Sequence, residues 1–102
     1  MITITAEEVK ARLDAGEAIH LVDVREPAEH AEFNIGGTLL PLGNVQTMQT
    51  DDIDALKNEE VICYCRSGAR STQACMMLET FGFTNVKNLA GGMMGWQEKF
   101  KG

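Results

Sequence analysis

The sequence of 102 residues is 44% hydrophobic and 24% charged, which provides enough apolar material for one core and excludes a disordered or collagen-like chain. No stretch approaches the roughly 20 apolar residues of a membrane span, and the N-terminus lacks the basic and apolar regions of a signal peptide, so we expect a cytoplasmic protein with a single domain over residues 1–102. Nine Lys and Arg against 15 Asp and Glu give a net charge of -6, which argues against nucleic acid and against an anionic membrane surface as partners.

Short periodic segments separated by glycine and proline predict helices and strands that alternate along the chain. The first helix starts at a capping box, Thr5–Glu8, and stops at Gly16. A second helix can start at Pro27. In chain order we expect a helix at 5–16, a strand at 19–24, a helix at 27–33, a strand at 38–42, a helix in the second half of 44–58, a strand at 60–65, a helix at 71–81, a strand at 84–89 and a helix from Gly91 onward.

Strands that alternate with helices are typical of an α/β domain with a mainly parallel central sheet. Ligands bind such sheets beyond the carboxyl ends of the strands, and two polar segments, 23–26 and 65–70, follow strands at such ends. In the first segment, Asp23 and Arg25 lie two residues apart, so their side chains leave the same face. We expect this pair to support neighbouring loops, with contact between Arg25 and a substrate as the less favoured alternative.

The segment after the third predicted strand has the composition of an anion-binding loop. Cys65 ends the strand, and a helix begins a few residues later. The backbone N–H groups of such a loop and the positive end of the helix can converge on one point, where they bind an anion and favour a thiolate over a thiol. Glycine in the loop supplies backbone freedom, and two arginines add positive charge. We therefore predict Cys65 as a nucleophile and the next six residues as its anion-binding loop: Arg66, Ser67, Gly68, Ala69, Arg70 and Ser71.

The other sulfur-containing side chains have simpler explanations. An odd number of cysteines in a cytoplasmic chain does not indicate a disulfide framework, and we expect Cys63 and Cys75 to pack in the core. We expect the same of the methionine pairs 76–77 and 93–94. The two histidines have no partners at metal-binding spacing and take plain surface or packing roles, so no metal and no cofactor are predicted. Ser71 opens the helix after the loop, where it can cap the helix and hydrogen-bond the sulfur of Cys65.

Three segments resemble the signatures of single-domain rhodanese proteins, the thiosulfate sulfurtransferases. Residues 61–71, Val-Ile-Cys-Tyr-Cys-Arg-Ser-Gly-Ala-Arg-Ser, resemble the active-site loop of the family. Residues 21–27 are similar to its first signature and residues 88–96 to its closing one. The matches occur in the right order and spacing and cover nearly the whole chain. The resemblance implies a rhodanese-like three-layer domain, with helices on both faces of the central sheet.

The resemblance also implies a ping-pong reaction. The Cys65 thiolate attacks the outer sulfur of thiosulfate or a similar anionic donor, sulfite leaves, and Cys65 carries a persulfide until a thiol, cyanide or protein acceptor takes the sulfur. Arg66 and Arg70 are then the candidates that draw in and orient the donor. Asp23 and Arg25 belong to the framework around the loop.

One segment departs from the family pattern. Family members usually have Gly-His-Ile-Pro-Gly-Ala after the short helix, whereas this chain has Phe-Asn-Ile-Gly-Gly-Thr at 33–38. The residues that follow, 39–42, make the segment one residue shorter than usual, and Asn34 replaces a titratable histidine by an amide. We therefore expect an altered loop geometry over residues 33–42 and no effect on Cys65.

Two other functions fit parts of the sequence. A phosphatase or arsenate reductase would use the same nucleophile, but cysteine phosphatases have Cys-x5-Arg, whereas this loop has four residues between Cys65 and Arg70 and contains no obvious acid for the leaving group. A persulfide carrier or interaction module that serves a protein partner would share the chemistry of Cys65. The sequence does not separate that module from an enzyme.

Overall fold

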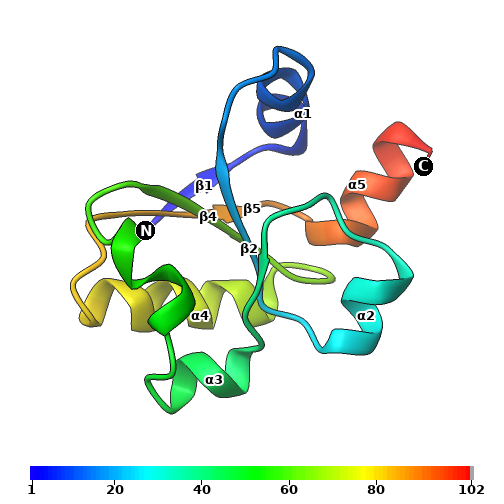
Figure 1. Ribbon diagram of the computed structural model, residues 1–102. Helices are drawn as coiled ribbons and strands as arrows, with labels where there is room; N and C mark the ends of the chain where they lie inside the picture. The colour runs from blue at the N-terminus through cyan, green and yellow to red at the C-terminus, as the bar shows by residue number, and fades with distance from the viewer. Residues whose placement is uncertain (102) are drawn as a thin grey trace.

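Five parallel strands form one sheet in the computed structural model, which describes residues 1–101 (Figure 1). The strands are β1 (Ile2–Ile4), β2 (His20–Asp23), β3 (Thr38–Leu39), β4 (Glu60–Tyr64) and β5 (Asn85–Leu89). Their order across the sheet is β1-β5-β4-β2-β3, so β4 lies at the centre. The predicted α/β fold is confirmed, and the sheet is parallel in every pairing of the described strands.

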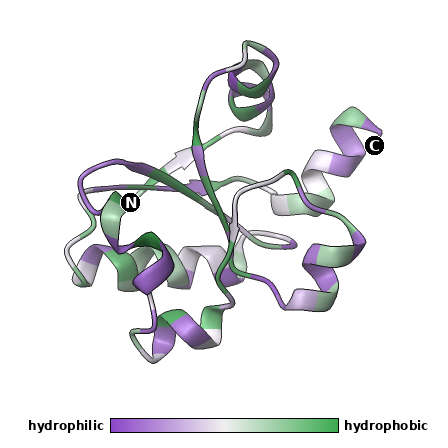
Figure 2. Cartoon of the chain, viewed as in Figure 1, coloured by the Kyte–Doolittle hydropathy of each residue, from purple (hydrophilic) through white to green (hydrophobic). Residues whose placement is uncertain are grey.

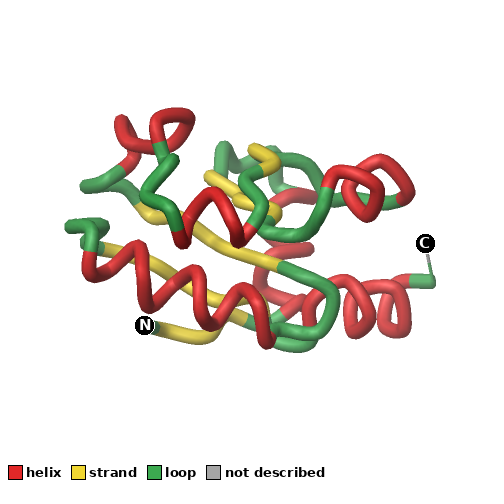
Figure 3. Tube along the Cα trace, turned by 90° about the horizontal axis from the view of Figure 1, so that it is seen from below, coloured by secondary structure: helices red, strands yellow, loops and turns green. Residues whose placement is uncertain are grey.

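Helices cover both faces of this sheet. They are α1 (Ala6–Asp14), α2 (Pro27–Glu32), α3 (Leu42–Gln46), the 3₁₀ helix η1 (Asp51–Leu56), α4 (Ala69–Thr80) and α5 (Gly92–Phe100). In Figure 1, α3 and α4 lie below the sheet, α1 lies above it, and α5 lies to its right. Residues of α1 and α5 contribute to one core. Figure 3, seen from below, shows α4 running alongside the strands. Over residues 1–101, none of these helices is long and apolar enough to cross a membrane.

The central strand β4 contributes to both cores, because successive side chains of a strand point to opposite faces. On one face, Val61, Cys63 and Cys65 pack with residues of α3, η1 and α4. On the other face, Ile62 and Tyr64 pack with residues of α1 and α5. A continuous apolar run of this kind is typical of a parallel strand that is covered on both sides. Figure 2 shows hydrophobic residues concentrated at the centre of the sheet.

The register of the sheet brings the polar segments that follow β2, β4 and β5 to the same side of the sheet, beyond the carboxyl ends of the strands. Asp23 at the end of β2 is level with Tyr64 on β4, and Cys63 on β4 is level with Asn88 on β5. Because the strands run in parallel, the chain leaves β2, β4 and β5 at the same edge. Asp23, Cys65 and Asn88 therefore lie close to one another beyond the ends of the central strands.

Two predicted elements need correction in this part of the chain, and one strand was not predicted. The sequence does not predict β1, a three-residue strand at the sheet edge in which Ile4 is the buried residue, because so short a segment has no clear period. The strand expected at 38–42 ends at Leu39, and Pro41 precedes α3, whose backbone closes onto the Pro41 carbonyl. The helix expected in the second half of 44–58 is a 3₁₀ helix, η1.

Candidate active site

Cys65 follows β4 directly and lies inside a tight loop that leads into α4. The residue is only 1% exposed. The backbone N–H of Gly68 donates to its Sγ over 3.0 Å, and that of Ser71 donates over 3.4 Å. The Ser71 hydroxyl oxygen lies 3.4 Å from the same sulfur. The helix begins at Ala69, two residues earlier than predicted, so Ser71 belongs to its first turn and brings an otherwise unpaired N–H to the sulfur.

These hydrogen bonds favour the thiolate form of Cys65. Burial acts to raise the pKa of the thiol, but the hydroxyl of Ser71 and the N–H groups of Ser71, Gly68 and Ser67 outweigh it, and the pKa is lowered from its ordinary value. The positive end of the α4 dipole acts in the same direction. The loop therefore has the electrostatics of a site for a nucleophilic sulfur.

The other two cysteines have a different character. Cys63 and Cys75 are buried, and all three cysteines of the described chain are free thiols. The neighbouring Cys75 thiol and burial raise the pKa of Cys63 well above its ordinary value. The predicted packing of Cys63 and Cys75 in the core is confirmed. Among the three, Cys65 is the thiol on which backbone N–H groups of the loop converge.

Gly68 turns the loop into α4 while it contributes to the sulfur site. Its φ of 109° lies in the region that favours glycine. Its carbonyl accepts hydrogen bonds from the Thr72 N–H over 3.0 Å and from the Thr72 hydroxyl over 2.7 Å. The same residue thus anchors the start of the helix and donates its own N–H to Sγ.

The start of α5 holds the loop from outside, a contribution that the sequence reasoning missed. The N–H groups of Met93 and Met94 donate to the carbonyls of Cys65 and Arg66, each over 2.9 Å. Gly92, with a φ of 54°, approaches so closely that an added Cβ would lie 2.6 Å from the Arg66 carbonyl carbon and against the Cys65 carbonyl oxygen. The glycines of the closing signature could have indicated this contact, because a helix end that packs directly against another backbone needs a residue without a side chain.

Asn88 is a second residue that the sequence reasoning missed. Its Oδ1 accepts a hydrogen bond from the Ser71 hydroxyl, and its Nδ2 donates to the Thr72 hydroxyl over 3.0 Å. Ser71, expected to cap the helix and to hydrogen-bond the sulfur, contacts the sulfur and is oriented by Asn88, but the N-cap position of α4 is Gly68. The sequence signal was an amide near the end of an apolar predicted strand, because buried polar groups need partners. In the structure Asn88 is 7% exposed.

Asp23 and Arg25 form a buried ion pair at the end of β2. Arg25 donates through Nε and Nη2 to the two carboxylate oxygens of Asp23, over 2.9 and 2.7 Å, and through Nη2 to the Phe33 carbonyl. His30 Nδ1 is hydrogen-bonded to the same carboxylate over 2.8 Å. Burial acts to raise the pKa of Asp23, but the hydrogen bonds from Arg25 and His30 outweigh it and lower the pKa. The pair joins β2 to α2, and its support of the Cys65 loop stays a prediction.

Tyr64 anchors the segment in which the chain departs from the family pattern. Its hydroxyl donates to the Gly36 carbonyl over 2.9 Å and accepts from the Ile35 N–H over 3.4 Å. Asn34 closes the turn, since its Nδ2 donates to the His30 carbonyl and its Oδ1 accepts from the Gly36 N–H. The amide in place of the family's histidine therefore organises the local backbone.

The two loop arginines have different surroundings. Arg70 donates through Nη1 and Nη2 to the two carboxylate oxygens of Glu29 on α2, over 2.7 and 2.9 Å. Hydrogen bonds from Arg70 and from the Glu26 N–H lower the pKa of Glu29 to about 2. The Arg66 guanidinium makes no ion pair within residues 1–101, in contrast to Arg12, Arg25 and Arg70. Arg66 is thus the loop arginine that is free to meet an anion.

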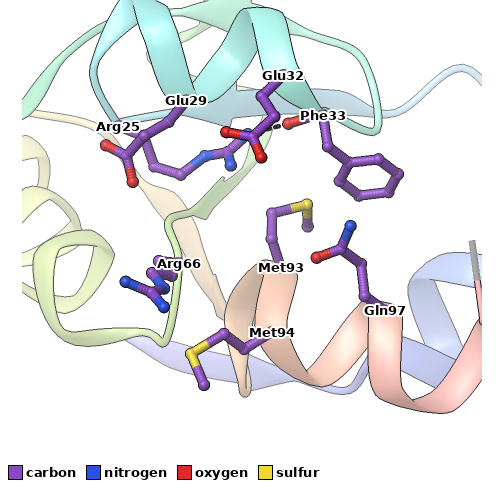
Figure 4. Close-up of a pocket in the computed structure, with 8 residues that line it drawn as sticks. All are labelled: Arg25, Glu29, Glu32, Phe33, Arg66, Met93, Met94 and Gln97. Atoms are coloured by element: carbon purple, nitrogen blue, oxygen red, sulfur yellow. Dashed lines mark hydrogen bonds between the residues drawn. The ribbon is translucent and has the colours of Figure 1, made fainter.

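A cavity of about 390 Å³ opens beside the loop, between α2 and α5 (Figure 4). Its walls come from the loop, from the start of α5, and from α2 with the residues that flank it. In that order, the lining residues are Arg66, then Met93, Met94 and Gln97, then Arg25, Glu29, Glu32 and Phe33.

Met93 is buried, but Met94 and Met76 are exposed, so the expectation that both methionine pairs pack in the core is wrong for these two.

A parallel α/β domain with hydrogen bonds that favour a thiolate beyond its central strand belongs to the class of domains in which a cysteine can act as a nucleophile towards a small substrate. The comparisons with known proteins narrow this class. A family model described as "Rhodanese-like domain" matches residues 5–99. A sulfurtransferase of Allochromatium vinosum is 40% identical over 94 residues, which cover 91% of this chain and 85% of the relative.

Two further relatives agree. The human thiosulfate:glutathione sulfurtransferase is 28% identical over 109 residues, covering 95% of this chain and 94% of that protein. The crystal structure of a rhodanese-like domain protein from Staphylococcus aureus superposes with a TM-score of 0.79 at 31% identity, covering 94% of this chain and 91% of that one. The chain belongs to the rhodanese-like domain family, and it is a rhodanese-like sulfurtransferase.

Proposed function

We propose that this sulfurtransferase takes sulfane sulfur from thiosulfate or a similar anionic donor and passes it to a thiol or cyanide through a persulfide on Cys65. The observation that carries the proposal is the convergence of the Gly68 N–H and the Ser71 N–H on Sγ. Donors that stabilise the thiolate can also hold the negative outer sulfur of the persulfide. The name of the human relative, which pairs thiosulfate with a thiol, supports this choice.

The reaction consists of two displacements at sulfur. In the donor step, the Sγ thiolate attacks the outer sulfur of thiosulfate, the S–S bond of thiosulfate breaks, and sulfite leaves with the electron pair. In the acceptor step, the acceptor sulfur attacks the outer sulfur of the persulfide, the bond to Sγ breaks, and Cys65 leaves as a thiolate. The proton of the acceptor thiol passes to the transferred sulfur, so the acceptor departs as a persulfide. The covalent intermediate divides one transfer into two easier steps.

The surroundings of Arg70 argue against a phosphatase. A phosphatase arginine must bind the phosphate, but both Nη atoms of Arg70 donate to Glu29. Glu29 itself is a poor candidate for the acid that protonates a leaving group, because a carboxyl with a pKa of about 2 is ionised at neutral pH. A sulfite leaving group needs no such acid, so the same arrangement suits sulfur transfer.

Mass spectrometry after treatment with thiosulfate tests the proposal. We expect one added sulfur atom on Cys65 and release of one sulfite for each loaded chain. Trypsin leaves Cys63 and Cys65 on one peptide, residues 58–66, and Cys75 on another, residues 71–87. Fragmentation of the first peptide between its two cysteines is therefore required. Sulfur on Cys63 or Cys75, or no loading at all, contradicts the proposal.

Alanine variants of the two loop arginines are expected to differ in the donor step. Loss of a charge-assisted hydrogen bond costs about 1.5–3 kcal/mol, so Arg66→Ala is expected to slow sulfite release roughly ten- to hundredfold. Arg70→Ala is expected to slow it by a smaller factor, because Arg70 is held by Glu29. Single-turnover sulfite release at several thiosulfate concentrations measures both. Equal losses would show that Arg70 also reaches the donor, as the sequence suggests.

A further inference from the structure

The cavity beside the loop contains charged side chains of two kinds. Arg25 and Glu29 are already committed, the first to Asp23 and the second to Arg70. Arg66 and Glu32 also line the cavity, but over residues 1–101 neither forms an ion pair or a side-chain hydrogen bond. The charges of Arg25 and Glu29 are neutralised by their ion-pair partners, so Arg66 and Glu32 remain as one unpaired cation and one unpaired anion in the cavity.

The two unpaired charges lie on different walls. Arg66 belongs to the loop, directly after the nucleophile, and Glu32 ends α2. Figure 4 shows the Glu32 carboxylate and the Gln97 amide extending into the cavity from opposite sides. A thiosulfate-like donor requires only the cation, so the carboxylate has no partner in the donor step.

We propose that the cavity binds a sulfur acceptor of low molecular mass that carries an ammonium group beside its thiol, and that Glu32 is the residue that recognises the ammonium. This inference rests on the proposed function, because the acceptor sulfur attacks the Cys65 persulfide in the way described above. An acceptor that also carries a carboxylate finds a second partner in Arg66. A neutral thiol uses neither charge.

The size and lining of the cavity fit such an acceptor. At about 30 Å³ for each water, its volume of about 390 Å³ corresponds to roughly a dozen water molecules, which is more than a thiosulfate ion occupies. Arg66, the residue that follows Cys65, lines the cavity, so an acceptor bound there lies beside the loop that holds the reacting sulfur. Phe33, Met93 and Met94 provide apolar surface for the carbon chain of the acceptor.

Glu32 is expected to act on one half-reaction alone. Its carboxylate attracts an ammonium group, whereas it repels the dianionic donor. Removing that charge therefore weakens the use of ammonium thiols without slowing the donor step. A residue that merely supported the fold would alter both half-reactions for every substrate.

The test uses Glu32→Gln and two thiols of equal length, cysteamine and 2-mercaptoethanol, which differ by an ammonium in place of a hydroxyl. Each thiol is mixed with protein whose Cys65 already carries sulfur, and loss of the persulfide is followed. We expect the variant to raise the KM for cysteamine roughly two- to fivefold, as an exposed charge pair allows, and to leave the KM for 2-mercaptoethanol unchanged. Because each thiol is compared with itself in two proteins, its intrinsic reactivity cancels. Added salt is expected to reduce the cysteamine effect.

A matched control is Glu59→Gln, which removes the same charge from an exposed side chain before β4, at the opposite edge of the sheet. It is expected to leave both KM values unchanged. Equal changes for the two thiols in Glu32→Gln, or no change for cysteamine, overturn the inference while the proposed function stands. Failure of Cys65 to load with sulfur overturns the proposed function, and the inference with it.

Discussion

Serine in place of Cys65 is expected to abolish sulfur transfer and to leave the fold intact. A hydroxyl is close in shape to a thiol and can accept the same hydrogen bonds from Gly68 and Ser71. It remains protonated at neutral pH, however, and does not take up sulfane sulfur, so neither half-reaction can proceed. Sulfite release from thiosulfate and thiocyanate formation with cyanide measure the activity, and the thermal unfolding midpoint reports the fold.

Cys75→Ser is the matched control for this variant. Cys75 is also buried and donates to the Lys87 carbonyl, a hydrogen bond that a serine hydroxyl can replace. Its surroundings do not provide the N–H groups that converge on Cys65, so we expect the control to transfer sulfur at close to the normal rate. Activity that survives in Cys65→Ser but disappears in Cys75→Ser would show that Cys75, and not Cys65, is the nucleophile.

The sequence predicts the strand, loop and helix around Cys65 because the signals there are local. The apolar run of β4 is buried on both faces, and the glycine, serine and arginines of the loop follow within a few residues. Weak or ambiguous local signals explain the errors elsewhere. The strand β1 has three residues, of which one is buried, and Pro41 fits the end of a strand as well as the start of α3.

The pairings that support the loop could not be predicted because they join segments that are distant along the chain. Arg70 meets Glu29 across 41 positions, and Ser71 meets Asn88 across 17. Composition indicates that a loop is positively charged, but it does not indicate which charge is already neutralised. That information decides which arginine is available to the donor, and it comes from the packing of α2 against the loop.

Insertion of one glycine between Gly68 and Ala69 is expected to lower sulfur transfer sharply. The N–H of Gly68 precedes the insertion and those of Ala69 onward follow it, so the Gly68 and Ser71 donors can no longer meet at Sγ. One added residue lengthens the chain by up to about 3.3–3.6 Å, which exceeds the tolerance of a hydrogen bond. Loss of one charge-assisted bond alone predicts a decrease of roughly ten- to hundredfold in the donor step.

A glycine inserted between Glu17 and Ala18, an exposed loop at the other edge of the sheet, controls for the effect of lengthening the chain. That control is expected to retain activity. The original protein is expected to show no detectable hydrolysis of an aryl phosphate. The protein with the widened loop is not expected to become a full phosphatase, because the loop contains no acid to protonate the leaving group in either protein. Normal sulfur transfer by the Gly68–Ala69 insertion would mean that loop length does not set the choice between sulfur and phosphate. The distinction would then depend on the Glu29 carboxylate that holds Arg70.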